Sequence, residues 1–224
     1  MFGYIVILVI ILYIYCIKLW HPNYSILMYK DIKDKAKSGD LILFSSLDSM
    51  NQIFMGSYIT HIGVVYRKDK DTPPILVESF NNFRMNCYPK EFKTGIATCD
   101  LETRLNSYRG FSMYKELDKP ISEHANMDFV EFTKYAKKHM SYDRDVIQGE
   151  ICKILFNTPF STKTNCGQFT ALILMKINLL DFSHFRNRSK HHLMWTANLT
   201  KVKKNFYRDP KYIYQQYFKV IDIE

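Results

Sequence analysis

Cys166 stands at the head of an apolar run, in the stretch TNCGQFTALIL from Thr164 to Leu174. A cysteine attacks only as the thiolate, so it needs a feature that lowers its pKa and a neighbouring base. If Asn165 or Thr164 caps a helix here, Cys166 lies in its first turn, where backbone N–H groups and the helix dipole favour an anion. The same N–H groups could bind the oxyanion of a tetrahedral intermediate. Two interpretations stay open, a reactive thiol or a small buried side chain that starts a core helix.

The base must come from elsewhere in the chain, and His61 is the best of the seven histidines because it begins the β-rich stretch HIGVVY. The loop KDKDTPP joins this stretch to ILVESF, which predicts a hairpin. If Tyr66 pairs with Ile75, then Gly63 lies opposite Glu78. His61 and Gly63 share one face of their strand, so His61 and Glu78 lie on the same face of the sheet. Gly63 has no side chain and leaves room beside the imidazole ring. A carboxylate there would orient the imidazole, the third role in a Cys-His-acid triad. A histidine at a strand end is commonly only a hydrogen-bonded polar residue, whereas an acid in an apolar strand is costly to bury without a partner.

The elements that must position these residues are predicted from hydrophobic periodicity. Runs typical of strands are residues 41–44, which follow the Gly39-Asp40 turn, 60–67, 75–80 and 110–117. A helix is predicted from Ser122 to His139, with Phe129, Phe132, Tyr135 and Ala136 on one face. Shorter helical segments are predicted at residues 49–57 and 146–156, and the YFKVIDI stretch near the C-terminus is a candidate closing strand. Strands mostly precede helices, which indicates one α+β domain.

Composition excludes several classes of protein. The chain has 224 residues, of which 47% are hydrophobic, so it can build a core. Its net charge is +9, but the basic residues are dispersed among carboxylates. The basic stretch KVKKNFYR at residues 201–208 is typical of a solvated face. For both reasons no nucleic-acid partner is expected. Five cysteines without a CxxC pair argue against a disulfide framework and indicate a reducing compartment. His184, His191 and His192 have no Cys or carboxylate ligand at metal spacing beside them, so no metal site is expected, and a thiol mechanism would require no organic cofactor.

The N-terminus is predicted to be a transmembrane anchor. Residues 1–17 carry no charged side chain and the apolar stretch continues to residue 20, which approaches the roughly 20 residues that a spanning helix needs. A cleaved signal peptide and a buried core helix are the alternatives, and no basic start or small-residue cleavage site favours the former. The predicted organisation is an anchor at residues 1–20, a connector at 21–37 that includes a short helix, and a thiol enzyme domain at 38–224.

The distribution of lysines predicts the orientation of this anchor. Five lysines follow the apolar stretch between residues 18 and 37, and none precedes it. The positive-inside rule then places the domain of a single-pass membrane protein on the cytoplasmic, reducing side, with a virion membrane as one candidate location. Sequons at Asn23, Asn187 and Asn198 would be glycosylated only in the opposite orientation.

Five stretches together resemble a known family. SGDLILFSS, THIGVVY, ILVESF, SYDRD and NCGQFTALIL occur in the order used by the circularly permuted branch of the NlpC-type papain-like superfamily, with histidine before cysteine. This branch includes bacterial and poxviral amidase-like proteins and the lecithin:retinol acyltransferase group. The resemblance spans residues 38–177 and implies an antiparallel sheet packed against helices, with Cys166 as nucleophile, His61 as general base and Glu78 as the orienting acid.

The resemblance also suggests which residues line the pocket. Tyr142 and Asp143 match a YD element before the cysteine helix, and Asn165, Gly167 and Gln168 surround the nucleophile. Gly167 and Gln168 replace the Glu-His pair usual in the acyltransferase group, and a glutamate as the third residue is closer to the amidase-like members.

These observations lead to one function hypothesis and one alternative. The hypothesis is a membrane-anchored cysteine enzyme, which is either a hydrolase (an amidase or peptidase) or a thioester-forming acyltransferase. It would act through an acyl-enzyme on an amide or ester substrate that is linked to lipid or peptide at a bilayer. The alternative is a non-catalytic viral or membrane protein that retains the fold as a structural or binding module. The sequence makes no prediction about oligomeric state.

Overall fold

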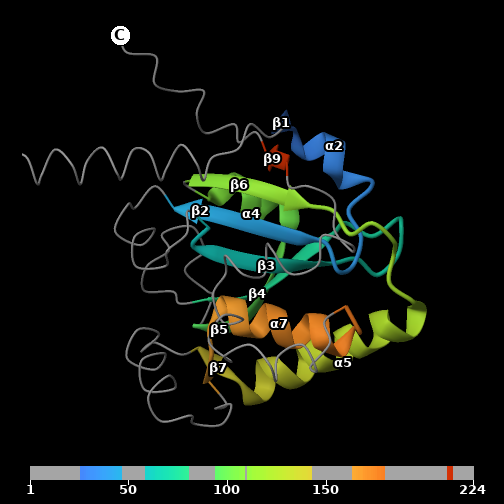
Figure 1. Ribbon diagram of the computed structural model, residues 1–224, viewed down its shortest axis with the longest axis vertical. Coiled ribbons are helices and arrows are strands. Elements are labelled where there is room, and N and C mark those ends of the chain that lie inside the picture. The colour runs from blue at the N-terminus through green and yellow to red at the C-terminus, as the bar shows by residue number, and fades with distance from the viewer. Residues whose placement is uncertain are drawn as a thin grey trace, which may run out of the picture.

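The computed structural model describes residues 26–46, 59–80, 94–108, 110–142, 163–179 and 211–213. Within these ranges the chain forms a seven-stranded sheet in the order β1-β9-β6-β2-β3-β4-β5 (Figure 1). Neighbouring strands run antiparallel, except for the parallel pair β1 and β9. The strands are β1 (Ile26–Leu27), β2 (Leu41–Ser46), β3 (His61–Tyr66), β4 (Ile75–Phe80), β5 (Gly95–Asp100), β6 (Gly110–Lys115) and β9 (Lys211–Ile213).

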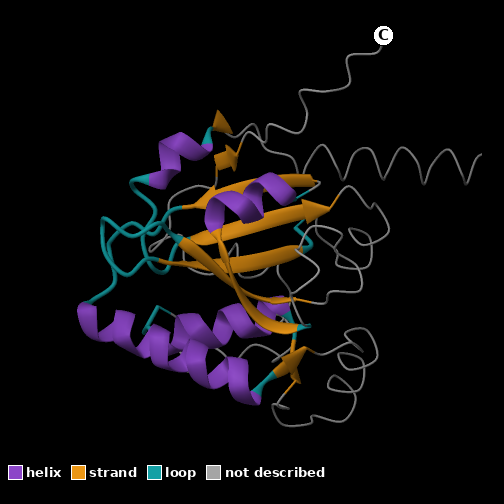
Figure 2. Cartoon of the chain, turned by 180° about the vertical axis from the view of Figure 1, so that it is seen from behind, coloured by secondary structure: helices purple, strands orange, loops and turns teal. Residues whose placement is uncertain are grey.

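Helices lie against both faces of this sheet. The helices are α2 (Tyr29–Lys33), α4 (Leu101–Ser107), α5 (Glu123–His139) and α7 (Cys166–Lys176). Figure 2 shows α4 across the face of the sheet turned toward the viewer, while α5 and α7 lie together along the lower side. A small parallel pair, β7 (Ser141–Tyr142) and β8 (Lys163–Thr164), joins the end of α5 to the start of α7.

Among the described residues, the alternation of side chains along the strands produces one large core on each face of the sheet. In β3, Ile62 and Val64 pack with the apolar residues of α5 and α7, whereas Val65 points to the opposite face and packs with α4. Phe169 and Ile173 of α7 are fully buried in the first of these cores. The structure is therefore an α+β domain with a largely antiparallel sheet packed against helices, as the sequence predicts.

Most predicted elements are present. β2, β3, β4, β6, α5 and α7 coincide with the predicted segments, and Ser122 caps α5 by accepting a hydrogen bond from the N–H of Ala125. One face assignment is wrong: Tyr135 is 58% exposed, because six residues of helix turn it about 120° away from the buried Phe129. The strand that pairs with β6 near the C-terminus is Lys211–Ile213, and YFKVIDI lies outside the described residues, as do the predicted helical segments at 49–57 and 146–156.

The predicted transmembrane helix requires a correction. Among the described residues, no helix is long and apolar enough to cross a membrane. The longest, α5, has 17 residues and carries charged side chains on its exposed face, whereas a span takes about 20 apolar residues. The fold class with an N-terminal transmembrane helix is therefore not supported, and the class that the described residues show is an α+β domain. Residues 1–20, on which the prediction depended, lie outside the described ranges.

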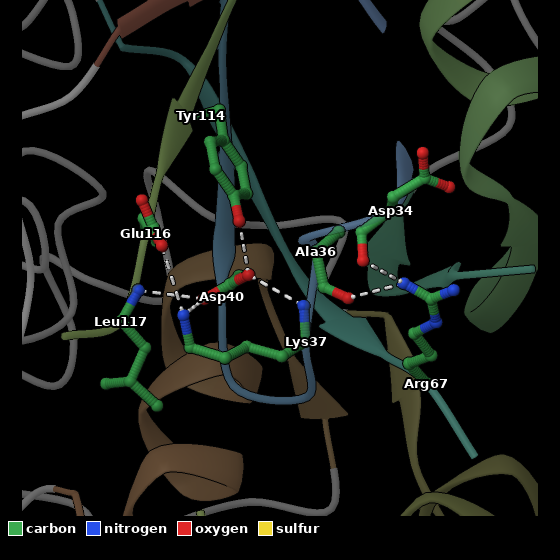
Figure 3. Close-up of polar contacts among 8 residues, drawn as sticks. All are labelled: Asp34, Ala36, Lys37, Asp40, Arg67, Tyr114, Glu116 and Leu117. Carbon is green, nitrogen blue, oxygen red and sulfur yellow. Dashed lines mark hydrogen bonds and ion pairs between the residues drawn. The ribbon is translucent and has the colours of Figure 1, made fainter. Parts of the chain in front are cut away.

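The predicted connector is partly built into the domain. Ile32 and Ala36, which lie in and directly after α2, are buried in the core on the α4 side of the sheet. Arg67 ties this segment to the β3–β4 loop. Its guanidinium donates hydrogen bonds to the carbonyls of Asp34 and Ala36, at 2.9 and 3.2 Å (Figure 3). It also donates one to the carbonyl of Thr72 in the loop, at 3.0 Å. The end of α2 and the hairpin loop are thus joined through one side chain.

Asp40 anchors the start of β2 from a fully buried position (Figure 3). Its carboxylate accepts hydrogen bonds from the hydroxyl of Tyr114 at 2.5 Å and from the backbone N–H groups of Lys37 and Leu117, both at 2.8 Å. Burial nevertheless raises the pKa of Asp40 to about 6. Gly39 makes the preceding turn with a φ of +94°, a conformation that glycine adopts readily.

Exchange of Tyr114 for phenylalanine is expected to destabilise the fold by about 1.5–3 kcal/mol at neutral pH, because a buried carboxylate loses a hydrogen bond. Since the pKa of Asp40 is raised in the folded state, its linked contribution to stability is largest below about 4 and declines as pH rises to about 6. The lost hydroxyl supports the ionised form, so the deficit of Tyr114→Phe should shrink in acid. Urea unfolding at pH 7.5 and 4.5 measures this, and equal deficits at both pH values would contradict it.

Candidate active site

Cys166 is the first residue of α7, and the helix start is fixed by a reciprocal cap. The side-chain oxygen of Asn165 accepts a hydrogen bond from the N–H of Gln168 at 2.9 Å, and the side-chain oxygen of Gln168 accepts one from the N–H of Asn165 at 3.2 Å. Cys166 itself is 6% exposed. The sulfur is therefore held in the first turn, where the positive end of the helix dipole favours a thiolate.

The cap also assigns roles to the neighbours of Cys166. Because the side chains of Asn165 and Gln168 bind each other's backbone, both build the helix start in this structure. The N–H of Gln168 is occupied by the same cap. Gly167 lies buried in the first turn, so its backbone N–H stays the predicted donor to an oxyanion.

His61 and Glu78 meet where β3 and β4 stop pairing. The register Tyr66↔Ile75 is as predicted, and the ladder between the two strands runs from there to Val64↔Val77. Beyond it, the Nε2–H of His61 donates to Oε2 of Glu78 at 2.5 Å. Both side chains are buried, to 4% and 0% exposure, so the contact is shielded from water.

His61 contacts residues from both cores. Its ring lies 5.5 Å from the ring of Phe44, which belongs to the core on the α4 side. It also hydrogen-bonds to Cys166, which belongs to the core beneath α7. Since Nε2 is bound to Glu78, Nδ1 is the ring nitrogen left to exchange a proton with the sulfur. The structure therefore brings together Cys166, His61 and Glu78, the three residues predicted to act as a triad.

The surroundings of His61 favour its protonated form. Burial alone lowers the pKa of an imidazole, but the negative charge of Cys166, the hydrogen bonds with Cys166 and Glu78, and the charge of Glu78 outweigh it and raise the pKa of His61 to about 9. An imidazolium between two anions is the state in which a thiolate is held ready for attack. The contribution of this group to folding stability is present below about 6.5 and is lost as pH rises through about 9.

Exchange of Cys166 for serine is expected to lower the pKa of His61 toward its ordinary value, because the charge of Cys166 is the largest of the influences that raise it. NMR titration of the imidazole carbon proton, assigned with a His61→Gln variant, measures the shift. A His61 pKa that is the same in Cys166→Ser as in the parent protein would mean that the sulfur carries no charge beside the ring.

A fourth group, which the sequence predictions do not include, completes this cluster. The Nε–H of Arg104 donates to Oε1 of Glu78 at 2.9 Å, and a terminal nitrogen of Arg104 lies 3.4 Å from Oε2. Both side chains are fully buried. The guanidinium carbon lies 4.3 Å from the centre of the Phe44 ring and 5.1 Å from that of Tyr108. The Arg104 side chain is thus held between an acid and two aromatic faces.

Arg104 also decides the ionisation of Glu78. Burial alone raises the pKa of the Glu78 carboxyl, but the charge of Arg104 and the contact with His61 outweigh it, so that the pKa is lowered. The stability that Glu78 contributes is therefore present above about pH 4.5 and is lost as pH falls through the lower folded-state pKa.

Cys99, on the neighbouring strand β5, contrasts with Cys166, because burial raises the pKa of the Cys99 thiol to about 11.

The remaining predicted residues are placed only in part. Backbone pairing puts Tyr142 next to Thr164, two residues before Cys166. Asp143 lies outside the described residues, as do His184, His191 and His192. Within the described ranges, no group of three or more histidine, cysteine, aspartate or glutamate side chains could hold a metal ion.

The sequence predicts that Gly63 leaves room for the ring of His61, but the side chain of Leu76 occupies this space. A side-chain carbon added at Gly63 would lie 2.9 Å from Leu76, so Leu76 of β4 fills the room. Gly63 is required here for the close approach of a neighbouring side chain.

Comparison with known proteins adds little to this geometry. No family model matches the sequence, and no curated protein matches it. Among solved structures, the chain is similar to the crystal structure of the metalloprotein yiiX from Escherichia coli O157:H7, DUF1105, with a TM-score of 0.42 and 15% sequence identity. The similarity covers 63% of this chain and 66% of that one.

Proposed function

We propose that this protein is a thiol acyl-transfer enzyme, a hydrolase of amides or esters or an acyltransferase, with Cys166 as its nucleophile. The observation that supports it most is the buried row of Cys166, His61 and Glu78, in which the imidazole hydrogen-bonds to the sulfur and, at 2.5 Å, to the carboxylate. The resemblance to the permuted NlpC-type papain-like superfamily supports the same assignment, because it gives these residues the same three roles.

The proposal assigns a role to each of these residues. The thiol proton passes to Nδ1 of His61, and the sulfur attacks the carbonyl carbon of the substrate while first-turn N–H groups of α7 stabilise the oxyanion. The leaving group departs with the bonding electrons and takes the proton from His61. Water or an amine, deprotonated by His61, then attacks the thioester and releases Cys166. Glu78 keeps the ring oriented throughout and does not take the proton.

An activated ester tests this proposal without knowledge of the natural substrate. Full-length protein mixed with p-nitrophenyl acetate should release one equivalent of nitrophenolate rapidly, and mass spectrometry of the digested protein should show one acetyl group on the Cys166 peptide. The Cys99 peptide is the internal comparison, because its buried thiol has a raised pKa. Acetylation of Cys166 no faster than that of Cys99 would overturn the proposal and leave a non-catalytic structural or binding protein with this fold.

A further inference from the structure

Arg104 reaches the site from a helix that none of the sequence predictions includes. It lies on α4, on the face that carries the buried residues Leu101 and Leu105, and its own side chain is fully buried. A buried guanidinium is strongly unfavourable unless it is paired. Its nearest acid is Glu78, which Arg104 contacts through two nitrogens. The two oxygens of Glu78 are thus both engaged, one mainly by Arg104 and the other mainly by His61.

We propose that Arg104 is a positioning residue of the site, which holds the Glu78 carboxylate ionised and oriented to accept the N–H of His61. This inference rests on the proposed function. Charges then alternate along the buried row from Arg104 through Glu78 and His61 to Cys166, so the thiolate and imidazolium form inside a cluster of zero net charge. Without the guanidinium the same state would carry a net negative charge away from water, which is costly.

The other described groups that face Glu78 do not supply this charge. His61 packs against it from β3 and Cys99 lies near it on β5, while Cys166 approaches from α7 through His61. Among these described neighbours, only Arg104 is a permanent cation. The rings of Phe44 and Tyr108 pack together against the guanidinium, whose carbon lies 4.3 and 5.1 Å from their centres, and they restrict its movement beside the Glu78 carboxylate.

The consequence concerns proton distribution between the acid and the ring. When Arg104 is replaced by methionine, which retains the apolar packing of the stem, the buried carboxyl of Glu78 loses the guanidinium that favours its ionised form and takes up a proton more readily. A protonated Glu78 no longer stabilises the imidazolium, so the thiol keeps its proton until the pH is higher. The acid limb of the Cys166 acetylation rate should move upward.

The experiment compares Arg104→Met with Arg104→Lys and with Arg67→Met, a matched exchange of a hydrogen-bonded arginine that does not contact the site. In Arg104→Met the acid limb should shift by at least about one pH unit, so that acetylation at pH 6 falls at least ~10-fold while the rate at pH 8.5 changes little. Arg104→Lys should restore part of the shift, and Arg67→Met should lose stability but keep the parent pH profile. A folded Arg104→Met with the parent profile would overturn the proposal.

A second measurement needs neither catalysis nor a variant that folds. The side-chain carboxyl carbon of Glu78 can be titrated by ¹³C NMR in the parent protein, where it should stay ionised below its ordinary pKa of 4.5. Titration at or above that value would overturn the role of Arg104 even in a protein that proved to be an enzyme. If Cys166 is not acetylated but Glu78 titrates below 4.5 in the parent protein, the proposed function fails while the assignment of Arg104 stands.

Discussion

Cys166→Ser is expected to lower the turnover of p-nitrophenyl acetate by at least about 10³-fold, to the level of the protein-free background. Serine has nearly the size of cysteine, but its hydroxyl is far less acidic than a thiol, so the site loses its nucleophile and keeps its shape. The rate of nitrophenolate release, measured alongside urea unfolding, separates lost chemistry from lost structure.

The matched control for this prediction is Cys99→Ala. Cys99 is also buried, on β5, and the charges of Glu78 and Arg104 act on its thiol, but it makes no contact with His61 in the described structure that would activate it. Its replacement should leave turnover within about twofold. Turnover that survives in Cys166→Ser and disappears in Cys99→Ala would contradict this prediction, because it would assign the chemistry to Cys99 on β5 and not to Cys166 on α7.

Glu78→Ala is expected to destabilise the fold by about 3–5 kcal/mol at pH 7, because it leaves the guanidinium of Arg104 buried without its carboxylate. Removal of both charges should cost less than removal of one, so the double variant Glu78→Gln, Arg104→Met should be more stable than Glu78→Ala. Urea unfolding at pH 7 gives the free energies.

An exposed acid on the same helix as Arg104 provides the reference for Glu78→Ala. Glu102 lies on the exposed face of α4, and its exchange for alanine should change the free energy of unfolding by no more than about 0.5 kcal/mol. A loss below about 1 kcal/mol for Glu78→Ala would show that water reaches Arg104 and that the cluster is not sealed.

The sequence predicts that Cys166, His61 and Glu78 lie together, and the structure places them so, because each residue follows a strong local signal. Cys166 stands directly after a capping residue, and His61 and Glu78 lie in two runs whose register is set by one short loop. A slip of one residue would have turned Glu78 to the other face, and the observed pairing of Tyr66 with Ile75 excludes it.

Arg104 escapes prediction because its environment comes from residues distant in the chain. Within LETRLNS it resembles an ordinary charged residue on a short helix, and only its place on the face of Leu101 and Leu105 suggests burial. The acid that compensates it lies 26 positions earlier, on β4, and Phe44 lies on β2. Hydrophobic periodicity does not report such pairings, since they depend on which strands become neighbours.

The order of elements along the chain has a consequence for biosynthesis. The strands that carry the imidazole and the acid, and the helix that carries the arginine, are all complete by residue 107, whereas the sulfur arrives with α7 at residue 166. During translation the ribosome therefore releases His61, Glu78 and Arg104 well before Cys166. If Cys166 is the nucleophile, as we propose, a nascent chain halted between these points lacks it, and the protein would gain its reactivity late in its own synthesis.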